Sequence, residues 1–138
     1  MKNESAVNAK CRNLLKGMFD FKVKWKRIED ASGELGTGDT LIGSQTGVGW
    51  IELKHAGPNA KPNYRPGQQA FLYDWGEAGI PAHTLIGSPN GRIRLLDHRC
   101  LDANKWRDHM VIDTHIGDKD QMRVLFMRCM MGESPKNT

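Results

Sequence analysis

Apolar side chains near the N-terminus recur at the spacing of an α-helix. Within residues 4–19 they are separated by steps of 4, 3, 1 and 3, which places them on one helical face. The sequence therefore predicts a helix over residues 4–19 that buries a single stripe, formed by Val7, Cys11, Leu14, Leu15 and Met18.

Strict alternation of apolar and polar residues follows this helix. Over residues 21–28, Phe21, Val23 and Trp25 alternate with lysines, as in a strand with one exposed face. Residues 39–54 hold two β-prone runs on either side of a turn at residues 44–47. They predict a β-hairpin.

A second helix is predicted between two β-prone segments. Pro66 suits the first turn of this helix and Gly79 suits its end. The strand-like residues 48–54 and 80–86 flank it, which implies a right-handed crossover and a parallel strand pair. Residues 92–96 form the expected partner strand, and the buried side of the helix is expected to be Phe71, Leu72, Trp75 and Ala78.

The C-terminal third carries one clear helix signal. Asp118 and Gln121 resemble a capping box, and apolar residues follow at helical spacing: Met122, Leu125, Phe126, Cys129 and Met130. We expect a helical extension over about residues 101–132 and a flexible tail over residues 133–138. The helix is also a candidate interface between two copies of the chain, through Leu125, Phe126, Met130 and Met131.

Length and element order define the expected architecture. A chain of 138 residues corresponds to one domain, here residues 1–132. Alternating strands and helices predict an α/β fold with a central mixed β-sheet flanked by helices.

Composition narrows the class of protein. The longest apolar run has four residues, 124–127, and the N-terminus has no signal-like stretch, so neither membrane insertion nor secretion is expected. Three widely spaced cysteines without a CxxC pair indicate buried, reduced thiols in a cytoplasmic protein. The net charge of +4 is compatible with a polyanionic partner without requiring one. No organic cofactor is expected, because no nucleotide-binding motif occurs.

The sharpest chemical signal is Asp39 followed by Glu52 and Lys54. On the second hairpin strand Glu52 and Lys54 share one face, while Leu53 points towards the core. Two carboxylates and the main-chain carbonyl of Leu53 form a hard oxygen site that suits Mg²⁺, with Mn²⁺ as a substitute. The metal would activate water and offset phosphate charge, while Lys54 would hold that water or stabilise developing charge.

A plainer interpretation competes with this one. Short acid–acid–lysine patterns arise often by chance, and Glu52 and Lys54 could form an ordinary surface ion pair. The context favours the metal site: a glycine-rich turn precedes Asp39, thirteen residues separate the two acids, and a strand–helix–strand unit follows.

Taken together, several segments resemble a known family. The chain is similar to the PD-(D/E)XK nuclease superfamily, and within it to the virus-type replication-repair nuclease (VRR-NUC) domain. The resemblance covers about residues 4–97 and is carried by residues 26–28, 32–33, 37–43, 49–54, 65–72 and 77–81. It implies a restriction-endonuclease-like fold.

The resemblance also implies roles for individual residues. Asp39 and Glu52 match the family's metal ligands, and Lys54 matches its catalytic lysine. Gln68 falls where the family places a glutamine at the start of the crossover helix, and Gln69 is the match if the register slips by one.

Glu4 lies where the family has a glutamate on the first helix. It could reach a metal-bound water and so join the catalytic set, or it could be an acid favoured by the helix dipole. One departure from the family pattern is Gly38, which replaces the proline before the motif aspartate and alters turn stiffness without altering ligand chemistry.

The implied function is Mg²⁺-dependent hydrolysis of DNA. Stand-alone domains of this type resemble phage proteins that cut branched DNA, such as Holliday junctions or flaps, and a junction resolvase is expected to be a homodimer because it cuts two strands. Candidate DNA contacts, each with a plainer surface role as the alternative, are His55, Lys61, Arg65, Arg92 and Arg94. The competing function is a non-catalytic DNA-binding or assembly subunit that keeps the fold.

Overall fold

One mixed β-sheet organises the chain. The computed structural model describes residues 1–28 and 40–133, and its six strands lie in the order β1-β2-β3-β4-β5-β6. Only β3 and β4 run parallel, and the other neighbouring strands are antiparallel. The elements are α1 (Glu4–Leu15), β1 (Lys24–Arg27), β2 (Thr40–Ser44), β3 (Gly47–His55), α2 (Gln68–Glu77), β4 (Ala82–Gly87), β5 (Arg92–Leu96), η1 (Ala103–His109), β6 (Met110–His115) and α3 (Lys119–Met131).

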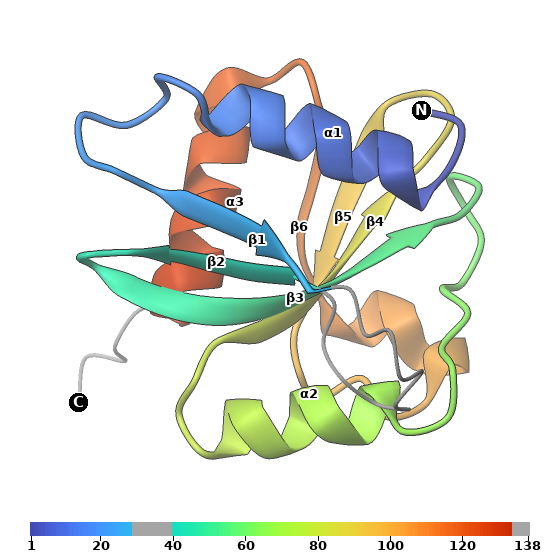
Figure 1. Cartoon of the computed structure of the whole chain (residues 1–138). Helices are drawn as coiled ribbons and strands as arrows, with labels where there is room; N and C mark the ends of the chain where they lie inside the picture. Colours follow the sequence, from blue (N-terminus) through green and yellow to red (C-terminus); the bar gives the residue numbers. More distant parts are fainter. Residues whose placement is uncertain (29–39, 134–138) are drawn as a thin grey trace.

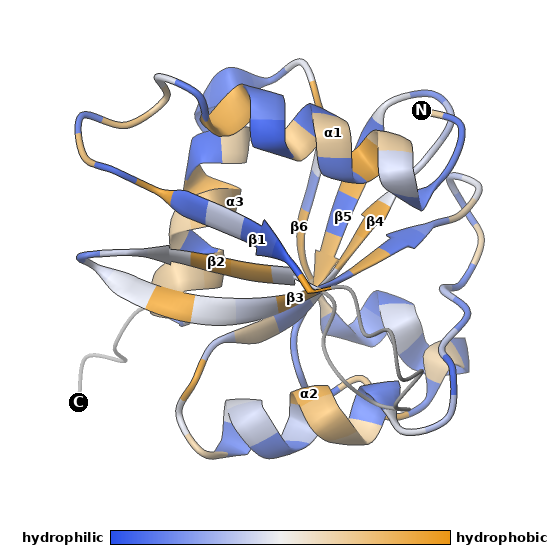
Figure 2. Ribbon diagram, viewed as in Figure 1, coloured by the Kyte–Doolittle hydropathy of each residue, from blue (hydrophilic) through white to orange (hydrophobic). Residues whose placement is uncertain are grey.

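Helices cover both faces of the sheet. The main core joins α1 and α3 to the inward side chains of the strands, among them Ile51, Leu53 and Leu85. On the opposite face lie α2 and η1, where Trp106 of η1 packs with Ile86 and Leu96. Figure 1 shows α1 and α2 on either side of the sheet. Figure 2 shows hydrophobic residues on β2 and β4, in the interior of the sheet, and mostly hydrophilic residues on β1, at its edge.

The two faces of β3 have different chemistry. Ile51 and Leu53 are fully buried in the main core. Because side chains alternate along a strand, Trp50, Glu52 and Lys54 lie on the face that carries α2. There, Trp50 packs edge-on against Phe71, with 5.1 Å between ring centroids. The predicted hairpin and the parallel β3–β4 pair are both confirmed.

Several predicted boundaries were wrong by a few residues. The first helix ends at Leu15, because the chain leaves the helix at Lys16 and Gly17 adopts a positive φ of 72°. The second helix begins at Gln68 and not at Pro66, since Gly67 has a left-handed conformation that cannot extend a helix. Trp75 and Ala78, predicted to be buried, are exposed.

The C-terminal extension is only partly helical. The prediction of a helical segment over residues 101–132 missed β6, which pairs with β5 along the edge of the sheet. The predicted helix cap is confirmed, because the side chain of Asp118 accepts a hydrogen bond from the backbone N–H of Gln121 at 3.1 Å.

The apolar face of α3 packs on the sheet. Leu125 and Phe126 are fully buried and Met130 is 1% exposed, so the proposed interface through these residues is wrong. Of the predicted interface residues, only Met131 lies at the surface. Among the helices that the structure describes, none is long and apolar enough to cross a bilayer.

Candidate active site

Two oppositely charged side chains are buried on the α2 face of β3. Glu52 is 1% exposed and Lys54 is 7% exposed, and 3.5 Å separates Lys54 Nζ from Glu52 Oε1. The alternative of a surface ion pair is therefore wrong. Burying two charges costs several kcal/mol of desolvation per ion, so such pairs are weak evidence for stability and often mark functional sites.

Gln68 joins these two charges. Its Oε1 accepts hydrogen bonds from Lys54 Nζ at 2.9 Å and from the backbone N–H of Arg65 at 2.7 Å. Its Nε2 donates to Glu52 Oε1 at 2.9 Å. An amide oxygen must face donors and an amide nitrogen must face the carboxylate, so this network fixes the orientation of the Gln68 side chain.

The start of α2 positions this glutamine. Gln68 is the first residue of the helix, directly after the left-handed Gly67, and its side chain is 2% exposed. Gln69 points elsewhere and donates to the carbonyl of Cys100 at 2.9 Å. Of the two candidate glutamines, the structure therefore places Gln68 with Glu52 and Lys54.

A tyrosine also lies beside Lys54. The sequence analysis did not identify this tyrosine as part of the site. The ring of Tyr64 lies under Lys54 Nζ, 5.5 Å from centroid to nitrogen, and its hydroxyl contacts Thr84 Oγ1 at 2.7 Å. Burial raises the pKa of Tyr64 above its usual value, so the ring stays neutral and attracts the ammonium group. Tyr64 lies in the loop before α2, four residues before Gln68, and no local sequence pattern places it beside Lys54.

Two predicted catalytic acids remain, Asp39 and Glu4, and the structure describes only Glu4. Asp39 lies outside the described residues. Glu4 is the first residue of α1 and is half-buried. Within residues 1–28 and 40–133, no hydrogen bond or ion pair joins Glu4 to Glu52 or Lys54. The start of α1, where Glu4 lies, is nevertheless near the end of β3, because His55 Nε2 is 2.9 Å from the main-chain oxygen of Met1.

Two of the predicted DNA contacts, Arg92 and Arg94, are held by other groups of the protein, and two, Lys61 and Arg65, are exposed. Arg94 is fully buried and donates to the carbonyls of Gly57 and Ala60, so its assignment as a DNA contact is wrong: it holds the loop after β3. Arg92 is engaged with Asp113 through two hydrogen bonds, and its Nε–Oδ1 distance is 2.8 Å. Lys61 and Arg65 remain at the surface of the same loop.

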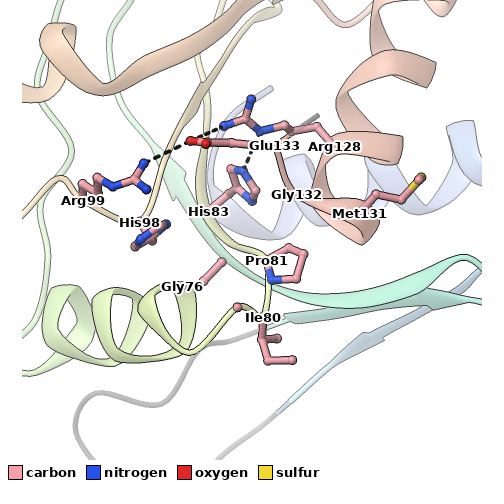
Figure 3. Close-up of a pocket in the computed structure, with 12 residues that line it drawn as sticks. Gly76, Ile80, Pro81, His83, His98, Arg99, Arg128, Met131, Gly132 and Glu133 are labelled. Atoms are coloured by element: carbon pink, nitrogen blue, oxygen red, sulfur yellow. Dashed lines mark hydrogen bonds and ion pairs between the residues drawn. The ribbon is translucent and has the colours of Figure 1, made fainter. Parts of the chain in front are cut away.

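A separate pocket lies beside the N-terminal end of β4 (Figure 3). His83 is 3% exposed there, and its Nε2 accepts a hydrogen bond from Arg128 Nε at 3.2 Å. Glu133 bridges Arg99 and Arg128, at 3.0 and 3.6 Å. Burial and the neighbouring Arg128 lower the pKa of His83 to about 3, so this histidine is neutral. Neither Glu52 nor Lys54 lines this pocket.

The candidate site offers two oxygen atoms from neighbouring residues as possible metal ligands. Glu52 supplies a carboxylate on β3, and Leu53 beside it supplies a main-chain carbonyl. Hard oxygen donors of this kind suit Mg²⁺ or Mn²⁺. No group of three or more His, Cys, Asp or Glu side chains with ligand spacing occurs among residues 1–28 and 40–133.

Comparisons with known proteins identify a structural neighbour. No family profile and no curated protein sequence matches the chain. The fold is similar to that of Hjc from Archaeoglobus fulgidus, a Holliday junction resolvase from an archaeal hyperthermophile. The TM-score is 0.51 at 13% sequence identity, and the match covers 84% of this chain and 97% of that chain. The likeness confirms the expected fold: a mixed sheet flanked by helices, consistent with a restriction-endonuclease-like architecture.

Proposed function

We propose that this protein is a metal-dependent DNA endonuclease of the PD-(D/E)XK superfamily, close to the VRR-NUC type. One observation carries the proposal: Glu52, Gln68 and Lys54 form a buried, hydrogen-bonded chain at 2.9 Å spacing. The superfamily resemblance matches Glu52 and Lys54 on the hairpin strand, and Gln68 on the crossover helix, to residues of the family's site. The similarity to a resolvase fold supports the same activity.

Asp39 and Glu52 are the proposed carboxylate ligands of the metal, with the carbonyl of Leu53 as a third oxygen. Chain connectivity supports the pairing: Thr40, directly after Asp39, pairs in register with Ile51, directly before Glu52. Glu4 is proposed to act through a bound water. A bound Mg²⁺ or Mn²⁺ would supply charge neutralisation at the phosphate and a more acidic water.

The remaining residues position Lys54. Its ammonium is held by Gln68 and lies over the Tyr64 ring, which restricts the rotation of a long, flexible side chain. From this place Lys54 orients the attacking water or stabilises charge that develops on the phosphate. Gln68 acts as a positioning residue, because it bridges two charged groups and keeps their separation fixed.

Branched DNA is the proposed substrate. The structural neighbour is named as a Holliday junction resolvase, and the family resemblance points to phage proteins that act in DNA replication, recombination or repair, on junctions or on flaps. Cutting two strands of a junction needs two catalytic centres, so we propose a homodimer. The reaction would take place in the cytoplasm of the producing or infected cell.

A cleavage assay on a panel of DNA structures tests the proposal. Labelled four-way junction, 5′ flap, splayed arm, duplex and single strand are incubated with Mg²⁺, Mn²⁺ or EDTA. We expect cleavage that requires the metal and falls at least about 1,000-fold in Lys54→Ala or Asp39→Asn. Lys105→Ala, which removes an exposed lysine of η1, is the matched control and should cleave normally.

Two further readouts sharpen the outcome. Mn²⁺ titration should show binding that is lost in Asp39→Asn, and circular dichroism should show that each variant is folded. Symmetric nicks across the junction support a dimeric resolvase, whereas cuts confined to the flap support a repair nuclease. Absence of cleavage by folded wild-type protein that still binds DNA would replace the proposal with a non-catalytic DNA-binding subunit.

A further inference from the structure

A positively charged groove lies between the end of α1 and the start of β1. Its cationic walls are formed by Arg12, Lys16, Lys22 and Lys24, and its apolar floor includes Trp25. All four cations are exposed, and no carboxylate of the described residues lines the groove.

The four cations have no counter-charge among the residues that the structure describes. Within residues 1–28 and 40–133, none of the four takes part in an ion pair, whereas Arg99 and Arg128 are both bridged by Glu133. The sequence explains the contrast: residues 5–28 contain seven lysines and arginines but a single acid, Asp20. Like charges that share a groove repel each other and destabilise the compact state unless an anion joins them.

Protection of the sheet edge does not account for the whole cluster. Lysine on an edge strand blocks unwanted strand pairing, and Lys24 on β1 fits that role. Arg12 and Lys16 belong to the region of α1 and its C-cap, and Lys22 precedes the strand. A partner with closely spaced negative charges satisfies all four, and duplex DNA carries one phosphate charge per about 1.7 Å of its axis.

The position of the groove relates it to the candidate active site. Helix α1 begins beside the end of β3, where Met1 contacts His55, and it ends at the groove. Twelve helical residues span about 18 Å, which corresponds to about five base pairs of duplex. The groove therefore lies about one helix length from the end of β3, beside α1, which covers the face of the sheet opposite Glu52 and Lys54.

We propose that the groove binds the phosphate backbone of a duplex arm of the substrate, away from the site of cleavage. The proposal rests on the nuclease function proposed above and adds to it a second, non-catalytic contact with the substrate. Binding there is independent of base sequence, because the groove offers only cations to the backbone.

Salt-dependent DNA binding tests this contact without requiring cleavage. Affinity for a four-way junction with long arms is measured by fluorescence anisotropy in EDTA over a series of salt concentrations. In Lys22→Gln/Lys24→Gln, the slope of log K against log salt should fall by about 1.8, and binding at 0.1 M salt should weaken about tenfold. Arg99→Gln/Lys105→Gln loses the same net charge elsewhere on the surface and should keep the wild-type slope.

The outcomes separate this proposal from the nuclease function. Lys54→Ala should lose cleavage and keep the wild-type salt slope. If the wild-type protein binds DNA with the expected difference between the two double variants but does not cleave, the nuclease proposal fails and the groove stands. Equal slopes in both double variants would overturn the groove as a DNA contact. Loss of binding to phosphatidylserine vesicles in Lys22→Gln/Lys24→Gln, with unchanged DNA binding, would assign it to a membrane surface instead.

Discussion

At the scale of single residues, the candidate site depends on one neutral side chain between two charges. The amide of Gln68 accepts from Lys54 and donates to Glu52, both at 2.9 Å, so it satisfies both buried partners at once. A buried ion whose hydrogen-bond partner is removed bears an uncompensated desolvation cost. The site is therefore sensitive to a substitution that leaves every charged residue in place.

Gln68→Leu should lower the cleavage rate at saturating substrate by about 100-fold, because Lys54 loses the acceptor that orients it. KM should change little, since the substitution leaves the proposed DNA-contact residues in place. Gln69→Leu is the matched control: it removes the neighbouring glutamine, whose side chain bonds to the Cys100 carbonyl, and should retain nearly full kcat. Equal rates for Gln68→Leu and the wild type would exclude Gln68 as a positioning residue.

A second residue-scale prediction concerns His83 and pH. Its pKa is lowered to about 3 in the folded protein, from 6.5 in an unfolded chain, by burial and by Arg128 (Figure 3). The unfolded state therefore binds a proton below pH 6.5 that the folded state does not bind, so the stability contributed by neutral His83 is lost as pH falls. The free energy of unfolding should decrease by up to about 1.4 kcal/mol per pH unit between about pH 6 and pH 4.

Urea unfolding at pH 7, 6 and 5 measures this dependence. In His83→Gln the amide cannot titrate, so the curve should be flatter by about one proton's contribution. Identical pH dependence in the variant and the wild type would contradict the assignment and place the titrating groups elsewhere.

At the scale of elements, patterns within short sequence segments predicted the helices and strands that local interactions determine. The hairpin, the crossover helix and the capped α3 follow from alternation, helical spacing and the Asp118 cap, and all are present. The strand β6 was missed because it is a half-buried edge strand, in which apolar and polar residues do not alternate regularly. Its pairing depends on the neighbouring β5, which no local pattern reports.

In the candidate site too, local patterns placed some residues, and the placement of others depended on the folded structure. Strand alternation alone placed Glu52 and Lys54 on one face of β3. The choice of Gln68 over Gln69 depended on the left-handed Gly67, which sets the first residue of α2. Burial of Arg94 was not foreseeable, because its partners are carbonyls of a loop 34 and 37 residues away in the sequence.

Close packing of α3 on the hairpin yields an element-scale prediction. A Cβ atom at Gly49 of β3 would lie 2.0 Å from the Cys129 carbonyl oxygen and 2.9 Å from that of Pro81. Both contacts are backbone atoms that cannot rotate away, so Gly49→Ala should destabilise the fold by about 1–3 kcal/mol or more. Chemical denaturation measures the change.

Gly57→Ala is the control for this substitution. Its added methyl would meet only the Ala60 side chain, at 3.8 Å, which is ordinary contact, so stability should change by less than about 0.5 kcal/mol. If both alanine variants had wild-type stability, α3 would not pack against β3 as closely as described.

At the scale of the whole molecule, the apolar face of α3 is buried against the sheet, so the expected contact between two copies must lie elsewhere. With Leu125 and Phe126 in the core, the apolar surface left on this side is a groove between β6 and α3 that includes Val124 and Met131. These two side chains are 54% and 57% exposed and line one groove, whereas Val48 on β3 and Leu101 in the loop before η1 are similarly exposed and do not line it. Exposed apolar side chains that share a groove are typical of protein interfaces, and those that are scattered are not.

We therefore expect the proposed homodimer to form through this groove. Val124→Glu/Met131→Glu should convert the dimer to a monomer in gel filtration with light scattering, because each copy would bury two carboxylates against an apolar surface. Val48→Glu/Leu101→Glu introduces the same charge at equally exposed positions and should remain dimeric. The monomeric variant should also lose paired cuts across a junction while still nicking one strand, since each copy carries its own Glu52, Gln68 and Lys54. A wild-type protein that is monomeric at micromolar concentration, yet cuts both strands symmetrically, would show that two centres on one dimer are not needed.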